Sequence, residues 1–324
     1  FLKSNYDKLI SYFASGVEVI PQKISPRLEL INSHTWQSDL FRLASLTWSV
    51  PVSRGYGRRM RFLVWDEFNG KLIGIFALGD PVFNSRVRDN CIGWTSKQRE
   101  KRLVNCLDAY VLGAIPPYNF LLGGKLVACL IKTKEVQKAF KKKYGNTKGL
   151  ISGKRKKAVL SMVTTSSALG RSSVYNRLKL GGANYFESVG FTEGWGHFHI
   201  PNNLFLDIRE YLAAIRHPYA SGYKFGSGPN WKMRATRAAL EAMGVNGDIL
   251  RHGIFREMFI CKFIKNCSSL LVGRSKIPRN NGVKSSKVVA DLAIKRWMIP
   301  RAERRPEFLY WKNQDIKKLL LEKR

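Results

Sequence analysis

The sequence has 324 residues, of which 44% are hydrophobic and 12% aromatic, enough for a buried core in one large or two ordinary domains. It carries 56 Lys and Arg against 23 Asp and Glu, a formal net charge of +33. No apolar run approaches the roughly 20 residues that a membrane-spanning helix needs. The excess of cations therefore predicts nucleic acid rather than an anionic membrane as the partner.

The first sixty residues predict a helical and irregular N-terminal segment, with one helix around Thr35 to Leu46. Because the chain begins at Phe1 and not at methionine, we expect the true N-terminus to lie ahead of it. A β-hairpin follows, since the runs RFLVWDE and KLIGIFALGD are joined by an Asn-Gly turn at Asn69-Gly70. These strands begin a core that we expect over residues 61 to 200.

The rest of the core alternates strands and helices. A third strand is expected to end at Pro116-Pro117, one or two helices to follow in FLLGGKLVACLIKTKEVQKAFKKKYG, and another strand in AVLSMVTT, 158 to 165. ANYFESVGF then predicts a short helix and WGHFHI a strand. This order is that of an acetyltransferase-like fold, so the expected class is α/β (α+β), a mixed sheet flanked by helices. Residues 201 to 324 predict a basic, mostly helical C-terminal region.

Basic residues gather in three places that predict contacts with phosphates. The linker from Lys141 to Lys157 has eight cations and no acid, and a solvated loop is its alternative interpretation. The stretch LGRSSVYNRLKLGG begins at Leu169, and the C-terminal region adds a basic helix and the aromatic HPYASGYKFGSGPNW, for which a Gly-rich packing loop is the alternative interpretation. The residues expected to bind nucleic acid are Lys141, Lys142, Lys143, Lys154, Arg155, Lys156, Lys157, Arg171, Ser172, Arg177, Lys179, Lys224, Lys232, Arg234 and Arg237.

Four residues carry a second hypothesis, an enzyme that acts on nucleic acid. Asp80 and Asp89 supply carboxylates that would hold Mg²⁺ for phosphodiester chemistry if they converge, and Arg88 stands next to Asp89, in a pair suited to position a reacting group. Tyr175, a phenol among guanidinium groups, is a candidate acid or strand-transfer nucleophile. The alternatives are a structural ion pair at Arg88 and Asp89, and a phosphate-binding loop without chemistry around Tyr175.

Three other patterns bear on ligands. Only Gly123, Gly124 and Lys125 stand where an acetyltransferase has its Q/R-x-x-G-x-G/A loop, so binding of acyl-coenzyme A is disfavoured. His197 and His199 share one face of the expected strand, as a metal or proton-transfer pair or as part of a polar edge. The five cysteines stand singly, without a C-x-x-C pair, which predicts buried thiols in a reducing, cytoplasmic compartment and disfavours zinc.

Several long segments resemble the DruA family of the Druantia anti-phage defence system, in the same order, from about Arg61 to Phe308. Among them are RFLVWDEFNGKLIGIFALGDPVFNSRVRDNCIGW, YFESVGFTEGWGHFHIP and KRWMIPRAERRPEF. The resemblance implies a bacterial defence protein linked to mobile DNA, because related domains are fused to insertion-sequence transposases. It also implies other defence subunits, such as a helicase, as partners, and it supplies no established activity.

Two motifs of the transposase-fused relatives have counterparts in this chain. Their R-D-x-x-I-G-W motif is matched by Arg88, Asp89, Ile92, Gly93 and Trp94. A second motif is matched in part by Tyr175, Gly190, Thr192, Gly194 and Gly196, with residues inserted after Tyr175 and with Trp195 and His197 where the relatives have Arg. The sequence therefore favours a protein that binds DNA or RNA, or both, through a basic cleft; a nuclease or strand-transfer enzyme is the alternative, and an acyltransferase is less favoured.

Overall fold

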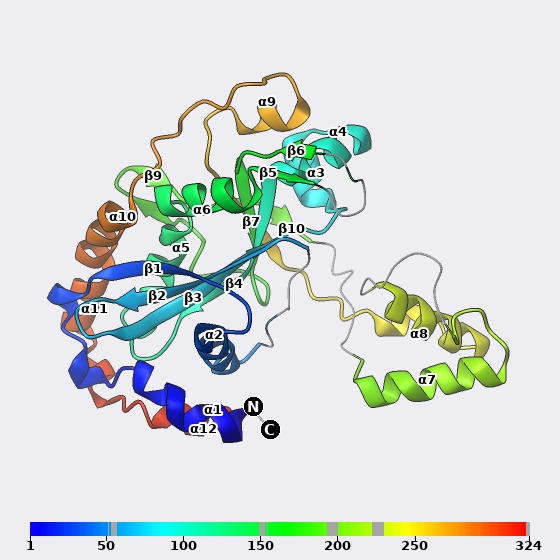
Figure 1. Cartoon of the computed structure of the whole chain (residues 1–324), viewed down its shortest axis with the longest axis horizontal. Helices are drawn as coiled ribbons and strands as arrows, with labels where there is room; N and C mark the ends of the chain where they lie inside the picture. The colour runs from blue at the N-terminus through cyan, green and yellow to red at the C-terminus, as the bar shows by residue number, and fades with distance from the viewer. Residues whose placement is uncertain are drawn as a thin grey trace. The chain divides into compact units, whose positions relative to one another are not determined.

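The computed structural model describes residues 1–50, 52, 57–148, 153, 155–192, 200–221 and 230–321 (Figure 1). Its centre is a seven-stranded sheet in the order β1-β2-β3-β4-β7-β11-β10. Neighbouring strands are antiparallel except β4 and β7, which are parallel. The strands of this sheet are β1 (Pro26–Ile31), β2 (Arg59–Asp66), β3 (Lys71–Gly79), β4 (Cys106–Ala114), β7 (Met162–Ser166), β10 (Glu187–Phe191) and β11 (Glu257–Lys262).

The hairpin predicted around Asn69-Gly70 is confirmed as β2 and β3. Gly70 has a φ of 70°, and the Asn69 side chain accepts a hydrogen bond from the Lys71 amide at 3.0 Å. Buried Asp66 closes the same turn, because its carboxylate accepts from the Ser25 and Phe68 amides and from the Tyr118 hydroxyl. Burial raises the pKa of Asp66 against the effect of these hydrogen bonds.

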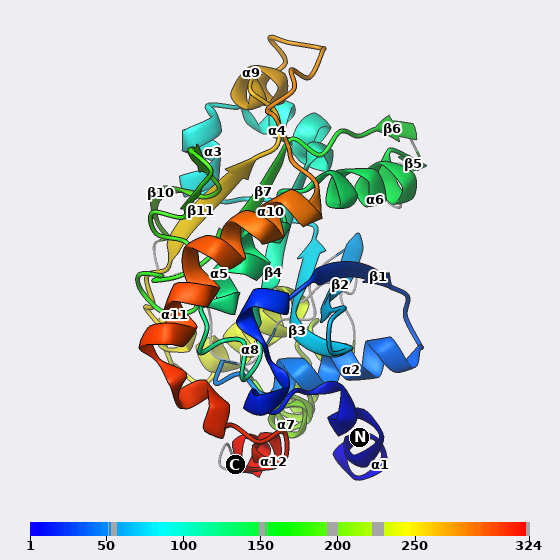
Figure 2. The same ribbon diagram turned by 90° about the vertical axis from the view of Figure 1, so that its left-hand side faces the viewer.

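Helices cover both faces of the sheet, which confirms the expected mixed sheet flanked by helices (Figure 2). Alternation along β2 divides its side chains between two cores: Met60, Phe62 and Val64 face one way, Leu63 and Trp65 the other. The first and main core is covered by α5 (Gly123–Leu130), α6 (Lys134–Tyr144), α10 (Ser286–Ala293) and α11 (Ile299–Arg304). The second is covered by α1 (Leu2–Leu9), α2 (Trp36–Leu46) and α12 (Asp315–Leu321). The likeness to acetyltransferases stays a prediction.

Smaller elements complete the described part of the chain. A third cluster around Ile92, Cys106 and Ile260 packs beneath α3 (Arg86–Ile92), α4 (Ser96–Arg102) and α9 (Cys267–Val272). Two short hairpins pair β5 (Asn146–Lys148) with β6 (Arg155–Lys157) and β8 (Lys179–Leu180) with β9 (Ala183–Asn184). Single helical turns span Ile10–Tyr12, Gly16–Glu18, Pro21–Lys23, Leu103–Asn105, Gly247–Leu250, Ile294–Met298 and Pro306–Tyr310.

The helix predicted in ANYFESVGF is wrong, because the segment forms β9 and β10. β10 pairs with β11, and the register shifts between Ser188 and Gly190. Gly190 has a φ of 116°, which no helical residue adopts. The register shift is a β-bulge, and Tyr185, Phe186, Val189 and Phe191 are the aromatic and β-branched residues that strands favour.

The chain divides into two compact units, Phe1–Phe191 with Glu257–Arg324 (unit 1) and Thr192–Arg256 (unit 2). Unit 2 is inserted between the paired strands β10 and β11, and the Thr192 amide donates to the Arg256 carbonyl at 2.9 Å where it begins and ends. Its helices α7 (Asn202–Ala214) and α8 (Asn230–Ala242) pack around Phe205 and Leu212. The ranges 1–60, 61–200 and 201–324 expected from the sequence do not coincide with these units and stay a prediction. The strand expected in WGHFHI, with His197 and His199, lies outside the described residues.

Four of the five cysteines are buried thiols, as predicted, and Cys91 is exposed. Burial raises the pKa of Cys261 and of Cys267 to about 12. None of the helices in the part of the chain that the structure describes is long and apolar enough to cross a membrane.

Candidate nucleic-acid interface

Arg88 and Asp89, predicted as catalytic residues, form the centre of a hydrogen-bonded ion pair. The Arg88 side chain is 1% exposed. It donates to Asp89 Oδ1 at 2.9 Å and to the carbonyls of Val82 and Phe83 at 2.7 and 2.8 Å. Asp89 also accepts from Trp94 Nε1 at 2.9 Å and from Arg99 at 2.8 Å. The pair therefore ties the segment before α3 to the start of α4.

The whole R-D-x-x-I-G-W motif has a packing explanation in this arrangement. α3 ends at Gly93, whose φ of 75° is the left-handed conformation that favours glycine at a helix C-terminus. Ile92 and Trp94 on either side of it are buried in the third cluster. Although burial raises the pKa of Asp89, the hydrogen bond from Trp94 and the charge of Arg88 hold it below its usual range. A catalytic role for Arg88 and Asp89 stays a prediction.

Asp80 is engaged in a second, separate ion pair. Its carboxylate accepts from Arg58 Nε at 2.7 Å and from the Arg58 amide at 2.9 Å. Arg58 also donates to the carbonyls of Val104 and Cys106, which links the first residues of β2 to those of β4. Among the described residues, no group of three or more His, Cys, Asp or Glu is arranged to hold a metal ion. The structure thus gives Asp80 a structural partner, and a Mg²⁺ role for it stays a prediction.

Tyr175 lies in the main core, not at the surface. Its ring packs against Phe186 and Phe259, with centroid distances of 5.3 and 5.4 Å. Burial raises the pKa of Tyr175 to about 12, which opposes formation of a phenolate. Ser172 holds the turn before it by accepting from the Val174 and Tyr175 amides. The loop still offers cations to solvent, because Arg171, Arg177 and Lys179 are exposed.

In unit 2, two of the three predicted basic residues of α8 have partners inside the unit. Lys232 donates to Asn202 Oδ1 at 2.7 Å and lies over the Phe205 ring. Arg237 faces Asp248 at 3.6 Å, whereas Arg234 is exposed. Lys154 and Lys224, and the side chain of Lys156, lie outside the described residues.

The predicted linker lysines belong in part to a helix. Val136 and Phe140 of α6 are buried in the main core, so the helix turns its lysines outward. Exposed lysines at positions i, i+4 and i+7 share one face of a helix. We define the α6 surface as six exposed cations, Lys134, Lys138, Lys141 and Lys142 of α6 with Arg155 and Lys157 of β6. Within the described part of the chain, the ion pairs include none of these six.

Part of the α6 surface is hollowed. A pocket of about 610 Å³ is lined by Lys134, Lys138, Lys141 and Lys157, while Phe140, Ala158, Val159 and Leu160 supply apolar side chains. Like charges this close repel each other in the absence of an anion. An anionic ligand with an apolar part is the chemistry that such a pocket accepts.

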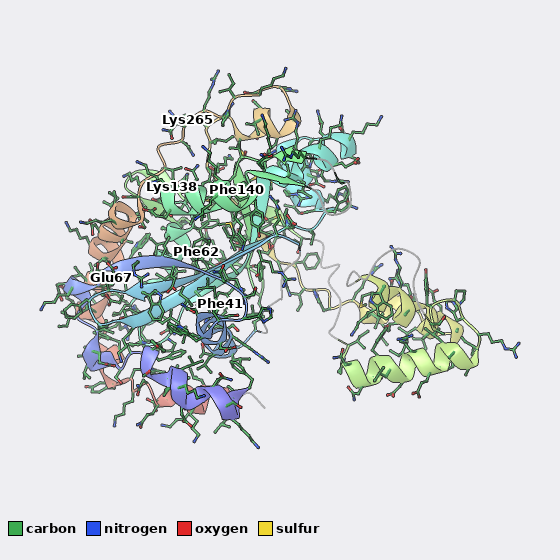
Figure 3. All side chains as sticks on the ribbon, in the orientation of Figure 1. Phe41, Phe62, Glu67, Lys138, Phe140 and Lys265 are labelled. Atoms are coloured by element: carbon green, nitrogen blue, oxygen red, sulfur yellow. The ribbon has the colours of Figure 1, made fainter. Side chains whose placement is uncertain are left out.

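Two segments without acidic residues adjoin α6, one in sequence and the other in space. Between Glu135 and Glu187 the sequence has twelve Lys and Arg and no Asp or Glu, and between Lys262 and Asp291 it has six more and again no acid. The second segment adjoins α6, because the Lys134 amide donates to the Lys284 carbonyl at 3.0 Å. Glu135 itself is engaged, accepting from the Ser286 amide at 2.9 Å. Figure 3 shows Lys138 and Lys265 toward the same end of the sheet.

One acid missed by the sequence prediction lies where β4 and β7 part. The two strands pair only at Cys106, Leu107 and Asp108, and Asp108 is the last. The Thr164 hydroxyl donates to Asp108 Oδ1 at 2.6 Å. Burial raises the pKa of Asp108 to about 6, against the effects of that hydrogen bond and of Arg88. Its sequence signal is weak, a single acid in the apolar strand CLDAYVLGA.

The sequence prediction also missed Lys134 and Lys138 and the cations of the second acid-free segment. Their signal was present, because acids are absent for long stretches, but adjacency to α6 follows only from the fold. Four lysines of the α6 surface line its pocket, and that pocket is not lined by Asp80, Asp89 or Tyr175.

Comparisons with known proteins give one consistent result. The model of the family described as Druantia protein DruA matches residues 1–273. Druantia protein DruA of Escherichia coli (strain UMEA 4076-1) is 56% identical over 316 residues, which cover 98% of this chain and 78% of that relative. No solved structure matches the chain.

Proposed function

Because the chain belongs to the DruA family, we propose that it acts in anti-phage defence as a nucleic-acid-binding component, with the α6 surface as its main contact. The observation that carries the proposal is the meeting of two acid-free segments at α6. Phosphate contacts from Lys and Arg supply most of the affinity of non-specific nucleic-acid binding. A link to mobile DNA and a helicase partner are further parts of this proposal.

The α6 surface suits a backbone contact more than a base-specific one. Five of its six cations are lysines, four of them line the pocket, and lysine binds phosphate as a point charge. The exposed Arg171, Arg177 and Lys179 extend the set of cations available to the ligand. We infer that recognition depends on charge and strand form, and that DNA and RNA compete for the same surface.

The test is a salt titration of binding, measured by fluorescence anisotropy with labelled single-stranded and duplex DNA and RNA. If all six cations of the α6 surface engage phosphates, the slope of log K against log salt is about −5 for duplex and about −4 for single strands. The triple variant Lys138→Gln, Lys141→Gln, Lys157→Gln should reduce the magnitude of the slope by about 2 to 3.

The matched control removes the same charge elsewhere in unit 1. Lys3, Lys8 and Lys317 are exposed on α1 and α12, and their replacement by Gln should leave the slope within about one unit of the wild-type value. A response that is flat in salt, or equal losses in both triple variants, would remove the proposal.

A second candidate function, catalysis on nucleic acid, is favoured by the Asp108 carboxyl. A carboxyl whose pKa is raised toward neutrality is suited to proton transfer. Incubating labelled strands with Mg²⁺ and comparing the wild type with Asp108→Asn, Asp89→Ala and Tyr175→Phe tests this function. Unchanged strands under all conditions count against it and leave the binding proposal untouched.

A further inference from the structure

A second pocket, on the other face of the sheet, combines cations with aromatic rings. It measures about 1130 Å³ and lies between α2, the first residues of β2, the middle of β4 and the C-terminal end of α6. Small-molecule sites measure roughly 300 to 1,000 Å³. The pocket is slightly larger than that range, so its volume is sufficient for a nucleotide. All of its lining residues belong to unit 1.

A bulge in β4 points one of the aromatic rings into this pocket. Ala77 pairs with Val111 and Leu78 with Ala109, which leaves Tyr110 as an extra residue on β4. Bulges redirect a side chain and are frequent next to functional sites. Tyr110 lines the pocket and is partly exposed.

A second ring is held against the same strand by a glycine. A Cβ on Gly113 would stand 2.8 Å from Trp48 Cζ2, closer than side chains allow, so the Trp48 ring depends on the absence of a side chain there. Trp48 and Tyr110 thus give the pocket aromatic surface beside β4. Such surface stacks on the face of any base.

Cations from β2 and α6 line the same pocket. Lys143 Nζ donates to the Arg59 carbonyl at 2.9 Å, which brings the C-terminal end of α6 onto β2. Arg61 is held by hydroxyls, donating to Ser38 Oγ and Ser33 Oγ at 3.1 Å each, and its guanidinium lies 5.8 Å from the ring centre of Phe41 (labelled in Figure 3). Burial, and then the charge of Arg61, lower the pKa of Lys143.

The charges that line this pocket are unbalanced. Arg42, Arg59, Arg61 and Lys143 face one carboxylate, Asp39. Holding Arg61 by serines leaves its charge available to a ligand, because a hydroxyl carries no charge to neutralise it. A compact dianion next to a planar ring satisfies both the cations and the aromatic rings of the pocket.

We propose that this pocket binds a nucleoside phosphate, with its phosphate on Arg61 and Lys143 and its base against Trp48 and Tyr110. The inference goes beyond the proposed function, because the pocket lies on the opposite face of the sheet from the main core and takes a single nucleotide. The source of the nucleotide is either a free mononucleotide or the phosphorylated end of a strand.

Calorimetry with AMP, adenosine and inorganic phosphate tests the pocket with free ligands. We expect AMP to bind at least about tenfold more tightly than either adenosine or phosphate, since only AMP engages both the cations and the aromatic rings. Arg61→Gln and Lys143→Gln should each weaken AMP about tenfold, and Trp48→Phe should weaken AMP and adenosine alike. Lys97→Gln, an exposed lysine of α4 that lines neither pocket, is the matched control and should leave AMP binding unchanged.

A pair of short oligonucleotides, with and without a 5′-phosphate, distinguishes the two sources. If the wild type prefers the 5′-phosphorylated strand and Arg61→Gln loses this preference, the ligand is a strand end and the proposal is supported. Binding of AMP supports the proposal with a free nucleotide as the ligand. Thermal unfolding of each variant verifies that it is folded. If neither AMP nor the 5′-phosphate improves binding, or if folded Arg61→Gln and Lys143→Gln bind both as the wild type does, the proposal is overturned, whatever the α6 surface binds.

Discussion

Replacing Arg88 by Met distinguishes a structural role from a catalytic one for the RDNCIGW segment. Methionine keeps much of the length of the buried side chain and removes its charge and its donors. The change leaves the Val82 and Phe83 carbonyls without their guanidinium donor and removes one cation from Asp89. Breaking a buried ion pair costs about 3 to 5 kcal/mol. Because Asp89 keeps Arg99 and Trp94, we expect the lower part of that range, about 3 kcal/mol.

The assay is urea unfolding at pH 7, followed by circular dichroism and tryptophan fluorescence. The pKa of Asp89 is lowered in the folded protein, so its ion pair stabilises fully above the ordinary carboxyl pKa and is lost as the pH falls through the lower folded value. The difference between the wild type and Arg88→Met should therefore shrink below pH 4. The double variant Arg88→Met, Asp89→Asn should be less destabilised than the sum of the two single variants.

A loss of less than about 0.5 kcal/mol, the range of ordinary surface substitutions, would refute this explanation of the motif. So would a difference that stays constant between pH 7 and pH 3. Either result would return Arg88 and Asp89 to the catalytic hypothesis.

Three other predictions follow from buried groups. Asp108→Asn should raise the free energy of unfolding at pH 8 by up to about 3 kcal/mol and lose this gain below pH 4. The pKa of Asp108 is raised in the folded protein, so the wild type loses stability as the pH rises from about 4 through 6. Melting temperatures at pH 4 and pH 8 measure the effect, and an Asn variant that melts lower than the wild type at pH 8 contradicts it. Tyr175→Phe should cost no more than about 1.5 kcal/mol in urea unfolding and leave the salt slope of nucleic-acid binding unchanged, since the ring packs in the core; a changed slope would place the phenol at the ligand. Gly74→Ala should cost about 1 to 3 kcal/mol by the same assay, because its Cβ would stand 2.4 Å from the Gly113 carbonyl oxygen and force β3 and β4 apart; a neutral effect would contradict this close approach.

The sequence was sufficient for elements with strong local signals. The Asn69-Gly70 turn fixed one hairpin, and the periodicity around Val136 and Phe140 indicated α6. ANYFESVGF was misassigned because its strand pairing is with β11, which follows about seventy residues later in the sequence. No local pattern reports a partner at that distance.

The candidate sites show the same limit. Three lysines of the α6 surface, Lys141, Lys142 and Lys157, were predicted from a charge run, whereas Lys134 and Lys138 lie outside that run and were missed. Asp108 could not be predicted, because its raised pKa depends on burial between β4 and β7. Likewise Arg61, Lys143 and Tyr110 come from three elements, and only the register of β4 and the packing of α6 bring them to one pocket.

The insertion of unit 2 between β10 and β11 has a consequence for how this chain can vary. The two strands pair directly up to Phe191 and Glu257, and the flanking Thr192 and Arg256 hydrogen-bond to each other. A tight turn would close the same hairpin, so the strand order of the sheet does not depend on what the hairpin carries. The pairing of β10 with β11 is complete without unit 2, so we expect the sheet to keep its strand order when unit 2 is replaced by a short turn.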